Sequence, residues 1–364
     1  MVTTGTALQF YAEGNTSRGS VSLFESSLQD LDRVYILKGG PGSGKSGLIR
    51  SVSSSLLNKG LHIWQLHCAR DNDSLDGVIV PSLRLGIVDG TAPHVIEPRL
   101  PGAVEQYVNL GEAWDTAALR AHKAEIARLN EHLEQTYERA YAGFADALKV
   151  HDEWEAIYIR NMDFKAADRL TEQLIKDLFG DAEQDRIGRV HRRFLGAATP
   201  IGAVDFVPNL TQGLQRRIFI KGRPGSGKST LLKRLAGAAE ERGFDVEIYH
   251  CGFDPKSLDM VIVRELSFAA FDSTPPHEYD PERPGDEIVD MYQACIPRDT
   301  DERHAVALSN FRAQYSARMK QAIACLAEAK SIHDELENIY VQATDFHVVD
   351  RIKAQLMQEI GLLL

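Results

Sequence analysis

The chain has 364 residues, of which 43% are hydrophobic and 26% are charged, values that are ordinary for a soluble protein. Its length predicts two domains, each long enough to bury its own core. The net charge of −11 argues against nucleic acid as a partner. The sequence has no run of 18 apolar residues, no signal-peptide pattern and no Cys-x-x-Cys pair, so we expect a cytoplasmic protein with reduced thiols and no membrane partner.

The first motif follows a predicted buried strand at 33–38 and precedes a helix with apolar residues at helical spacing from 48 to 57. The loop between them matches G-x-x-x-x-G-K-[ST], the phosphate-binding P-loop pattern, and strand, loop and helix are the context that this motif requires. The residues expected to bind the nucleotide are Gly39, Gly40, Pro41, Gly42, Ser43, Gly44, Lys45, Ser46 and Gly47.

This loop predicts a nucleoside triphosphate and Mg²⁺ as ligands. Its glycines let successive backbone amides turn inward as an anion nest, and the following helix adds the partial positive charge of its N-terminus. Lys45 is expected to reach the β- and γ-phosphates, and the Ser46 hydroxyl is expected to ligate Mg²⁺. No Asn-Lys-x-Asp segment that would read guanine follows the loop, so ATP is the expected nucleotide.

Further strands are predicted at 61–67 and 84–89, and the second of these ends in Asp89. We expect Asp89 to hold Mg²⁺ through a water molecule, and the alternative is an aspartate that caps the next turn. Gly90 follows, where many fast P-loop ATPases place the glutamate that activates water. Hydrolysis is therefore slow, or another residue orients the water, or the acceptor is not water. His94 is the nearest candidate base, although a structural histidine is the alternative.

His67 and Cys68 close their strand at the sheet edge where α/β proteins bind ligands. We expect Cys68 to be buried and His67 to face the ligand. A metal ion there would need two further ligands, and His94 or Asp89 could converge on it. Asp76 is a secondary candidate for catalysis.

No proline occurs from 103 to 199, and apolar residues there recur at steps of three, four and seven. This spacing predicts an amphipathic helical arm of one to three helices. The arm either packs on its own domain or projects as a coiled arm. His151, Glu155 and Tyr158 share one helical face, which we expect to contact the nucleotide domain or the other arm.

The whole pattern is repeated once along the chain. Lys228 follows Lys45 by 183 positions, and the same offset relates His250-Cys251 to His67-Cys68. Strands are expected at 216–221, 244–250 and 266–272, and weaker strand candidates lie at 8–11, 78–80 and 94–97. The second site comprises the nucleotide-binding residues Gly222, Arg223, Pro224, Gly225, Ser226, Gly227, Lys228, Ser229 and Thr230, the Mg²⁺ ligands Ser229 and Asp272, and the candidate base His277.

The repeat predicts an α/β protein made of two P-loop NTPase domains, each a three-layer α/β/α unit with a mainly parallel sheet and a helical arm. The first unit is expected at 1–190, with its nucleotide core at about 8–110 and its arm at about 112–180. The second is expected at 191–364, with its core at about 193–297 and its arm at about 300–360. A polar joining segment lies at 180–193, and the two units form a pseudo-dimer within one chain.

Four segments resemble an uncharacterised bacterial family of tandem P-loop ATPases. They are residues 37–46, 194–197, 220–230 and 249–255. The resemblance extends over nearly the whole chain, and it implies ATP binding and hydrolysis without naming a substrate. Gly47 stands where threonine is usual in that family, and this leaves Ser46 as the Mg²⁺ ligand.

Three functions remain open from the sequence. The leading prediction is a slow or partner-stimulated ATPase, whose arms transmit the nucleotide state to an unidentified protein partner. The second is a P-loop kinase that transfers the γ-phosphate to a small molecule or nucleotide, with an arm as the lid over the acceptor. The third is a scaffold that binds ATP without turning it over. Arg18 and Arg223 are candidate arginine fingers by position alone.

Overall fold

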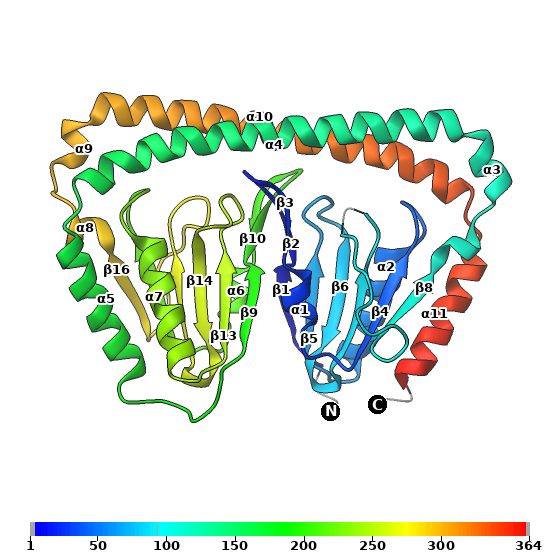
Figure 1. Ribbon diagram of the computed structural model, residues 1–364, viewed down its shortest axis with the longest axis horizontal. Coiled ribbons are helices and arrows are strands. Elements are labelled where there is room, and N and C mark those ends of the chain that lie inside the picture. Colours follow the sequence, from blue (N-terminus) through cyan, green and yellow to red (C-terminus); the bar gives the residue numbers. More distant parts are fainter. Residues whose placement is uncertain (1–3, 93, 362–364) are drawn as a thin grey trace.

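The computed structural model describes residues 4–92 and 94–361. It has a mixed α/β fold, in which one mainly parallel sheet of 12 strands runs through the molecule beneath a pair of long helices (Figure 1). The sheet order is β16-β12-β15-β14-β13-β9-β1-β5-β6-β7-β4-β8.

Each half of the sheet has six strands in corresponding order, and one strand of each half runs against its neighbours. In the first half, β6 is antiparallel to β5 and β7, and in the second half β14 is antiparallel to β13 and β15. The first half consists of β1 (Ala7–Tyr11), β4 (Arg33–Lys38), β5 (Ile63–His67), β6 (Leu75–Val80), β7 (Leu85–Asp89) and β8 (Glu105–Asn109). The second consists of β9 (Val190–Phe194), β12 (Arg216–Lys221), β13 (Val246–His250), β14 (Leu258–Val263), β15 (Phe268–Asp272) and β16 (Asp286–Asp290).

Helices cover one face of the sheet, and short helices and irregular segments cover the other. On the first face, α2 (Lys45–Asn58) and α11 (Phe346–Gly361) share a core in the first half. There α5 (Phe164–Phe179), α7 (Lys228–Glu241) and α8 (Met291–Cys295) share the core of the second half. A single core cluster spans both halves on the opposite face, where α1 (Phe24–Leu28) and α6 (Val207–Leu210) pack.

Two short hairpins stand between the sheet and the long helices. The first is formed by β2 (Glu13–Thr16) and β3 (Gly19–Ser22), and the second by β10 (Gly196–Thr199) and β11 (Gly202–Asp205). The Ser17 N–H donates to the carbonyl of Phe253, and the Asn15 side chain donates to the carbonyl of Ala198. These contacts tie the first hairpin to the second half.

The long helices α4 (Lys123–Arg160) and α10 (Ala305–Gln342) pair antiparallel across the top of the molecule (Figure 1). Tyr137, Ala140 and Phe144 pack against Ala322 and Leu326 at the centre of the pair. The helices are preceded by α3 (Thr116–Ala121) and α9 (Thr300–Arg303).

Each helical arm crosses to the other half of the molecule. After α4 the chain enters α5, which packs on α7 of the second half, and after α10 it enters α11, which packs on α2 of the first half. Each long helix also contacts its own repeat, since α4 packs on β2 and β3 and α10 packs on β10. The alternative of packing on the arm's own domain is therefore correct for the middle of the long helices, while their ends and the following helices lie on the other repeat. The arms are exchanged between the two repeats.

The predicted strands next to both glycine loops are confirmed, at 33–38 and 216–221. The candidates at 8–11 and 78–80 fall in β1 and β6, whereas 94–97 is not a strand. The segment interpreted as a joiner contains β9, which pairs with β1 and β13 and makes the two halves one sheet.

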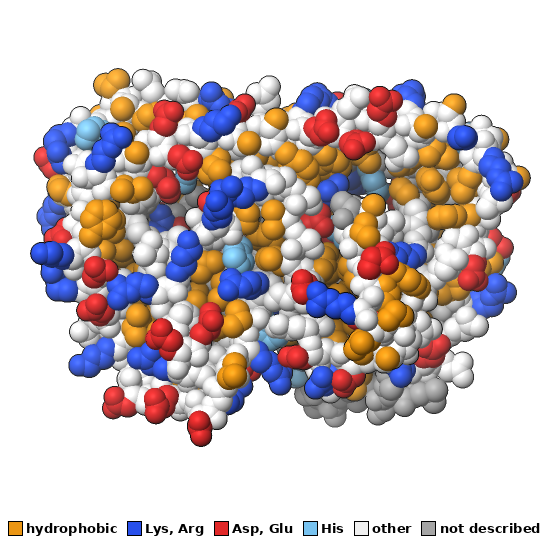
Figure 2. Space-filling view, viewed as in Figure 1, with side chains coloured by type: hydrophobic (Ala, Val, Ile, Leu, Met, Phe, Trp, Pro, Cys, Tyr) orange, Lys and Arg blue, Asp and Glu red, His pale blue; other side chains and the backbone are white. Residues whose placement is uncertain are grey.

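No helix of the described chain is both long and apolar enough to cross a membrane. Basic and acidic side chains are interspersed over the face seen in Figure 2, without a single-sign patch on that face.

The buried cation at the junction of the halves is Arg193 on β9. Its guanidinium lies over the rings of Phe10 and Trp64 from the first half, 4.3 and 4.1 Å from the ring centroids. The carboxylate of Glu247 lies 3.7 Å from it and also accepts a 2.7 Å hydrogen bond from Arg264. Burial alone would raise the pKa of Glu247, but Arg193 and Arg264 outweigh it and lower this pKa to about 2.

We predict that Glu247→Gln lowers the free energy of unfolding at pH 7 by roughly 3–5 kcal/mol, because it leaves the buried Arg193 without its counter-charge. The contribution of Glu247 is complete above its unfolded pKa of 4.5 and is lost as the pH falls toward 2. The variant should therefore lose less stability than the wild type between these pH values. Urea unfolding at several pH values measures both effects.

The matched control is Glu287→Gln, which breaks an exposed ion pair with Arg216 on the edge of the sheet. It should cost at most about 1 kcal/mol. Equal losses in the two variants would contradict a stabilising role for the pair at the junction.

Candidate functional site

The first glycine loop connects β4 to α2 and has the backbone of an anion nest. Gly42 and Gly44 have φ of 65° and 84°, in the left-handed region that glycine adopts without steric cost. Gly44 is the N-cap of α2, and no side chain caps this helix. The amides at the start of α2 are thus available to a bound anion.

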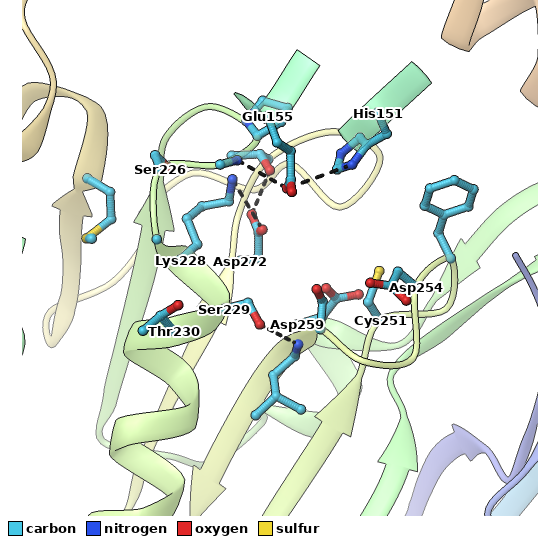
Figure 3. Close-up of a pocket in the computed structure, with 18 of the residues that line it drawn as sticks. His151, Glu155, Ser226, Lys228, Ser229, Thr230, Cys251, Asp254, Asp259 and Asp272 are labelled. Carbon is cyan, nitrogen blue, oxygen red and sulfur yellow. Dashed lines mark hydrogen bonds and ion pairs between the residues drawn. The ribbon is translucent and has the colours of Figure 1, made fainter. Parts of the chain in front are cut away.

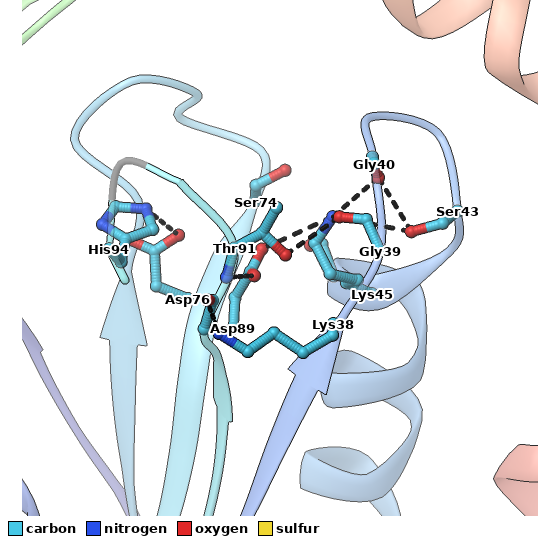
Figure 4. Close-up of polar contacts among 12 residues, drawn as sticks. Lys38, Gly39, Gly40, Ser43, Lys45, Ser74, Asp76, Asp89, Thr91 and His94 are labelled. Atoms are coloured by element: carbon cyan, nitrogen blue, oxygen red, sulfur yellow. Dashed lines mark hydrogen bonds and ion pairs between the residues drawn. The ribbon is translucent and has the colours of Figure 1, made fainter. Parts of the chain in front are cut away.

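Lys45 lies at the start of α2 and bends back over the loop. Its Nζ donates to the carbonyls of Gly39 and Gly40, at 2.9 and 2.7 Å. The Asp89 carboxylate is 3.7 Å from this ammonium, because β4 and β7 are parallel neighbours (Figure 4). The structure thus brings together the predicted lysine, loop and strand-end aspartate.

Thr91 is a site residue to which the sequence analysis gave no role. Its N–H donates to Asp89 Oδ1 at 2.8 Å, and its hydroxyl donates to the carbonyl of Gly39 at 2.9 Å. These two bonds hold Asp89 against the glycine loop. Thr274 also bonds Asp272, but through its hydroxyl, which donates to Oδ1 at 2.6 Å, so the repeated Asp-x-Thr spacing was the signal that could have identified it.

The second glycine loop, between β12 and α7, repeats this geometry. Gly227 is an uncapped N-cap with a φ of 86°. The Lys228 Nζ donates to the carbonyl of Arg223 at 3.0 Å and lies 3.5 Å from Asp272. The Ser229 hydroxyl oxygen accepts one backbone N–H at 2.9 Å and keeps a second lone pair. The Ser46 oxygen accepts a backbone N–H at 3.0 Å and also an N–H of Arg50 at 3.3 Å, so Arg50 must move before Ser46 can bind Mg²⁺ as predicted.

A carboxylate from the opposite repeat occupies the second glycine loop. Near the end of α4, Glu155 Oε1 accepts the N–H of Gly225 at 3.2 Å (Figure 3). A Cβ on Gly225 would stand 2.5 Å from the carbonyl of Glu155, so only glycine allows the helix to approach this closely. The carboxylate oxygen stands in for the anion that such a nest binds.

The first loop is covered in the same way by the end of α10. A Cβ on Gly42 would lie 2.8 Å from the carbonyl of Glu337, and one on Gly40 would lie 3.0 Å from Tyr340. The helical face that the sequence predicts to contact a nucleotide domain or the other arm therefore contacts both. Each loop is covered by the arm of the other repeat, rather than facing the other loop.

His151 lies one turn before Glu155, with Nδ1 3.8 Å from the carboxylate. Burial lowers the pKa of His151 and raises that of Glu155. Both shifts disfavour charge at this position, so the glycine-loop amide is the polar partner that favours the ionised carboxylate. His333 and Glu337 are the corresponding residues over the first loop.

A cavity of about 540 Å³ opens over the second loop. The residues from Pro224 to Leu231 form its floor, together with Asp272. Both long helices contribute to its walls, with His151 and Glu155 from α4 and Tyr315 and Met319 from α10 among them. Its volume is within the range of small-molecule sites.

The structure does not bring His94 to the loop. Its buried ring bonds Glu13 through Nδ1, and Nε2 lies 3.6 Å from Asp76 (Figure 4). Burial would lower the pKa of His94, but Asp76 and Glu13 outweigh it and raise this pKa to about 9. A histidine that holds its proton between two carboxylates is poorly suited to be a base, so that role stays a prediction.

His277 has a related placement with one difference. Its Nδ1 bonds Asp205 at 2.8 Å, and the ring reaches the wall of the second cavity.

The position after each strand-end aspartate offers no base. A Cβ on Gly90 would lie 2.3 Å from Ile36, and the Ser273 hydroxyl is buried against the carbonyl of Tyr279.

Other predicted placements differ from the structure. The His67 ring lies tilted against Phe206, with ring centroids 4.5 Å apart, and its ligand-facing role stays a prediction, while Cys68 is buried as expected. Arg223 pairs with Asp301 at 3.0 Å, and Arg18 pairs with Asp254 at 3.2 Å. Neither arginine is free to act as a finger unless that pair breaks.

Comparison of the chain with protein-family models, with curated proteins and with solved structures gives no match in any of the three. The resemblance to tandem P-loop ATPases therefore stays a prediction, and the functional argument rests on the geometry of the site.

Proposed function

We propose that this chain binds Mg-ATP at both glycine loops and hydrolyses it slowly, as a nucleotide-dependent switch made of two P-loop units in one chain. The observation that supports this best is the bond from the Gly225 amide to the Glu155 carboxylate, because an amide of the loop already has a carboxylate as its partner. Lysine, serine and aspartate side chains also lie around both loops, and these are the residue types that bind phosphate and Mg²⁺ in P-loop proteins.

In this proposal each group of the loop has a separate task. Lys45 and Lys228 hold the β- and γ-phosphates, while Ser46 and Ser229 bind Mg²⁺ directly. Asp89 and Asp272 hold the ion through water, and Thr91 and Thr274 keep these carboxylates in place. Bound Mg²⁺ supplies positive charge that offsets the charge of the phosphates. With no glutamate after either aspartate, turnover is slow or depends on a partner.

The switch follows from competition for one site. A γ-phosphate and the Glu155 carboxylate are both anions and would use the same loop amide, so binding of ATP pushes Glu155 out of the loop. Because Glu155 lies on α4, its displacement changes how the first repeat's arm packs on the second half. The arms then present the nucleotide state of both sites to a protein partner.

One observation favours a kinase as the second candidate. The cavity over the second loop extends to apolar arm residues such as Phe164, Met319 and Ile323, which leaves room for a small acceptor. In that case the arms would close over the acceptor as a lid. Production of ADP that rises only when an acceptor is added would favour this function over the switch.

We predict that Lys45→Ala and Lys228→Ala each remove ATP binding at one loop, so the wild type binds two ATP and each single variant one. Loss of the lysine's charge-assisted contacts should weaken binding at its loop by at least about tenfold. Calorimetric titration with Mg-ATP counts the sites, and ADP release measures turnover in the single and double variants.

The control is Lys59→Ala, at the other end of the helix that begins with Lys45, where an exposed lysine of the same charge is removed. It should leave both stoichiometry and turnover unchanged. If ATP binds the wild type but no ADP forms, and the lysine variants only lose thermal stability, the chain is a scaffold. Undiminished ATP binding in the double variant would contradict nucleotide binding at the loops.

We predict that Glu155→Gln tightens ATP binding at the second loop by about tenfold. The substitution removes a charged competitor of the phosphate, and a hydrogen bond to a charged group contributes about 1.5–3 kcal/mol. The measurement uses the Lys45→Ala background, so that only the second loop binds ATP.

Glu153→Gln is the matched control, since Glu153 is exposed on the same turn of α4 and carries the same charge. Its affinity for ATP should equal that of the parent variant. An unchanged affinity together with lost turnover in Glu155→Gln would contradict competition and would assign Glu155 a role in hydrolysis.

A further inference from the structure

Three side chains that can bind a metal ion, a thiol, a carboxylate and an imidazole, lie together in the first half, outside the glycine loop. Cys68, Asp76 and His94 are all buried, and one ligand atom from each lies within 4.8 Å of the other two. Cys68 follows β5, Asp76 is on β6 and His94 is in the loop after β7, so three neighbouring segments of the fold bring them together. Nothing in the proposed nucleotide chemistry requires a thiol at this position.

The distance between His94 and Asp76 fits a shared metal ion better than a hydrogen bond. His94 Nε2 and Asp76 Oδ1 are 3.6 Å apart, beyond hydrogen-bond length. Zinc bonds nitrogen and oxygen at about 2.0–2.2 Å in a tetrahedral arrangement, which places two such ligands roughly 3.3–3.6 Å apart.

The surroundings of His94 are those of a metal-ligating histidine. Its Nδ1 is bonded to the buried carboxylate of Glu13, which leaves Nε2 facing Asp76. Such a carboxylate fixes the tautomer and the orientation of a ligating imidazole. Arg70 lies 3.6 Å from Glu13 and Ser20 bonds it, so Glu13 is itself held in position.

The side chain of Asp76 gives independent support for a metal ion in this cluster. Its Oδ2 atom is fully buried and has no hydrogen-bond partner among residues 4–92 and 94–361. An unpaired carboxylate oxygen in the interior costs free energy, and a cation would offset that cost. From the three ligand atoms, their spacing and this oxygen, we infer that Cys68, Asp76 and His94 bind one zinc ion, with Glu13 as the residue that orients His94.

The ligand set selects the metal. A thiolate, an imidazole and a carboxylate together suit Zn²⁺, whereas Mg²⁺ prefers oxygen ligands alone. Binding releases the thiol proton of Cys68 and the Nε2 proton of His94 to solvent, and the zinc takes the freed lone pairs. No electron is transferred, so the step needs no oxidant or reductant. The ion is distinct from the Mg²⁺ proposed at Ser46 and Asp89.

The second half contains the corresponding residues Cys251, Asp259 and His277, but in the described chain they do not converge within the same distance. Both halves have a carboxylate beside this histidine, but it comes from the first strand of the hairpin in the first half and from the second strand in the second half. Glu13 faces Ser22 across the first hairpin, and Asp205 faces Gly196 across the second, at positions offset by 183. The second half therefore supplies a matched control for the zinc site.

The test uses full-length, tag-free protein that is stripped with a chelator and then titrated with Zn²⁺ or Co²⁺ in excess Mg²⁺. We expect about one tightly bound ion per chain and, with Co²⁺, a thiolate-to-cobalt charge-transfer band. Cys68→Ser should abolish the band, and Asp76→Asn should weaken metal binding at least about tenfold. Cys251→Ser should leave both unchanged.

A second measurement covers the case in which Cys68→Ser does not fold. Zn²⁺ should raise the melting temperature of the stripped wild type, because it binds only the folded chain, and the same concentration of Mg²⁺ should not. Two bound ions, one of them lost with Cys68→Ser, would still support this site. No metal uptake by the wild type, or a charge-transfer band that survives Cys68→Ser, would overturn the proposal.

Discussion

The antiparallel pairing of α4 and α10 is the constraint on which the rest of the molecule depends. Each helix has 38 residues and is therefore about 57 Å long, enough to reach from one half of the sheet to the other. Close packing of Gly143 against Ala322 sets their register at the centre. With this register, the end of each helix lies on the glycine loop of the opposite half, and the following helix completes that half's core.

Neither of the proposed nucleotide sites is therefore built by one repeat alone. The loop, lysine and strand-end aspartate come from one repeat, and the carboxylate above the second loop comes from the other. An anion in that loop acts on a helix whose opposite end lies over the first half. The fold thus provides a physical connection between the sites, in addition to the continuous sheet at β1 and β9.

The sequence predicts those features of the fold that depend on residues close together along the chain. It identifies both glycine loops, the strands before them and the helical face with His151 and Glu155, because each follows from short-range spacing. It does not predict which loop Glu155 covers, since that depends on packing between helices far apart in sequence. The hairpins were missed because their strands have four residues and little apolar alternation. The partner of His94 is likewise 81 positions away.

Hydrogen exchange in the Lys45→Ala variant tests directly whether ATP at one loop changes the arm of the other repeat. In this variant the proposal expects ATP to bind only at the second loop. Addition of Mg-ATP should change amide exchange near the end of α4 and in α5, which belong to the first repeat, and leave α11 less affected. Changes confined to the second loop and α7, or larger in α11 than in α5, would contradict the coupling between repeats.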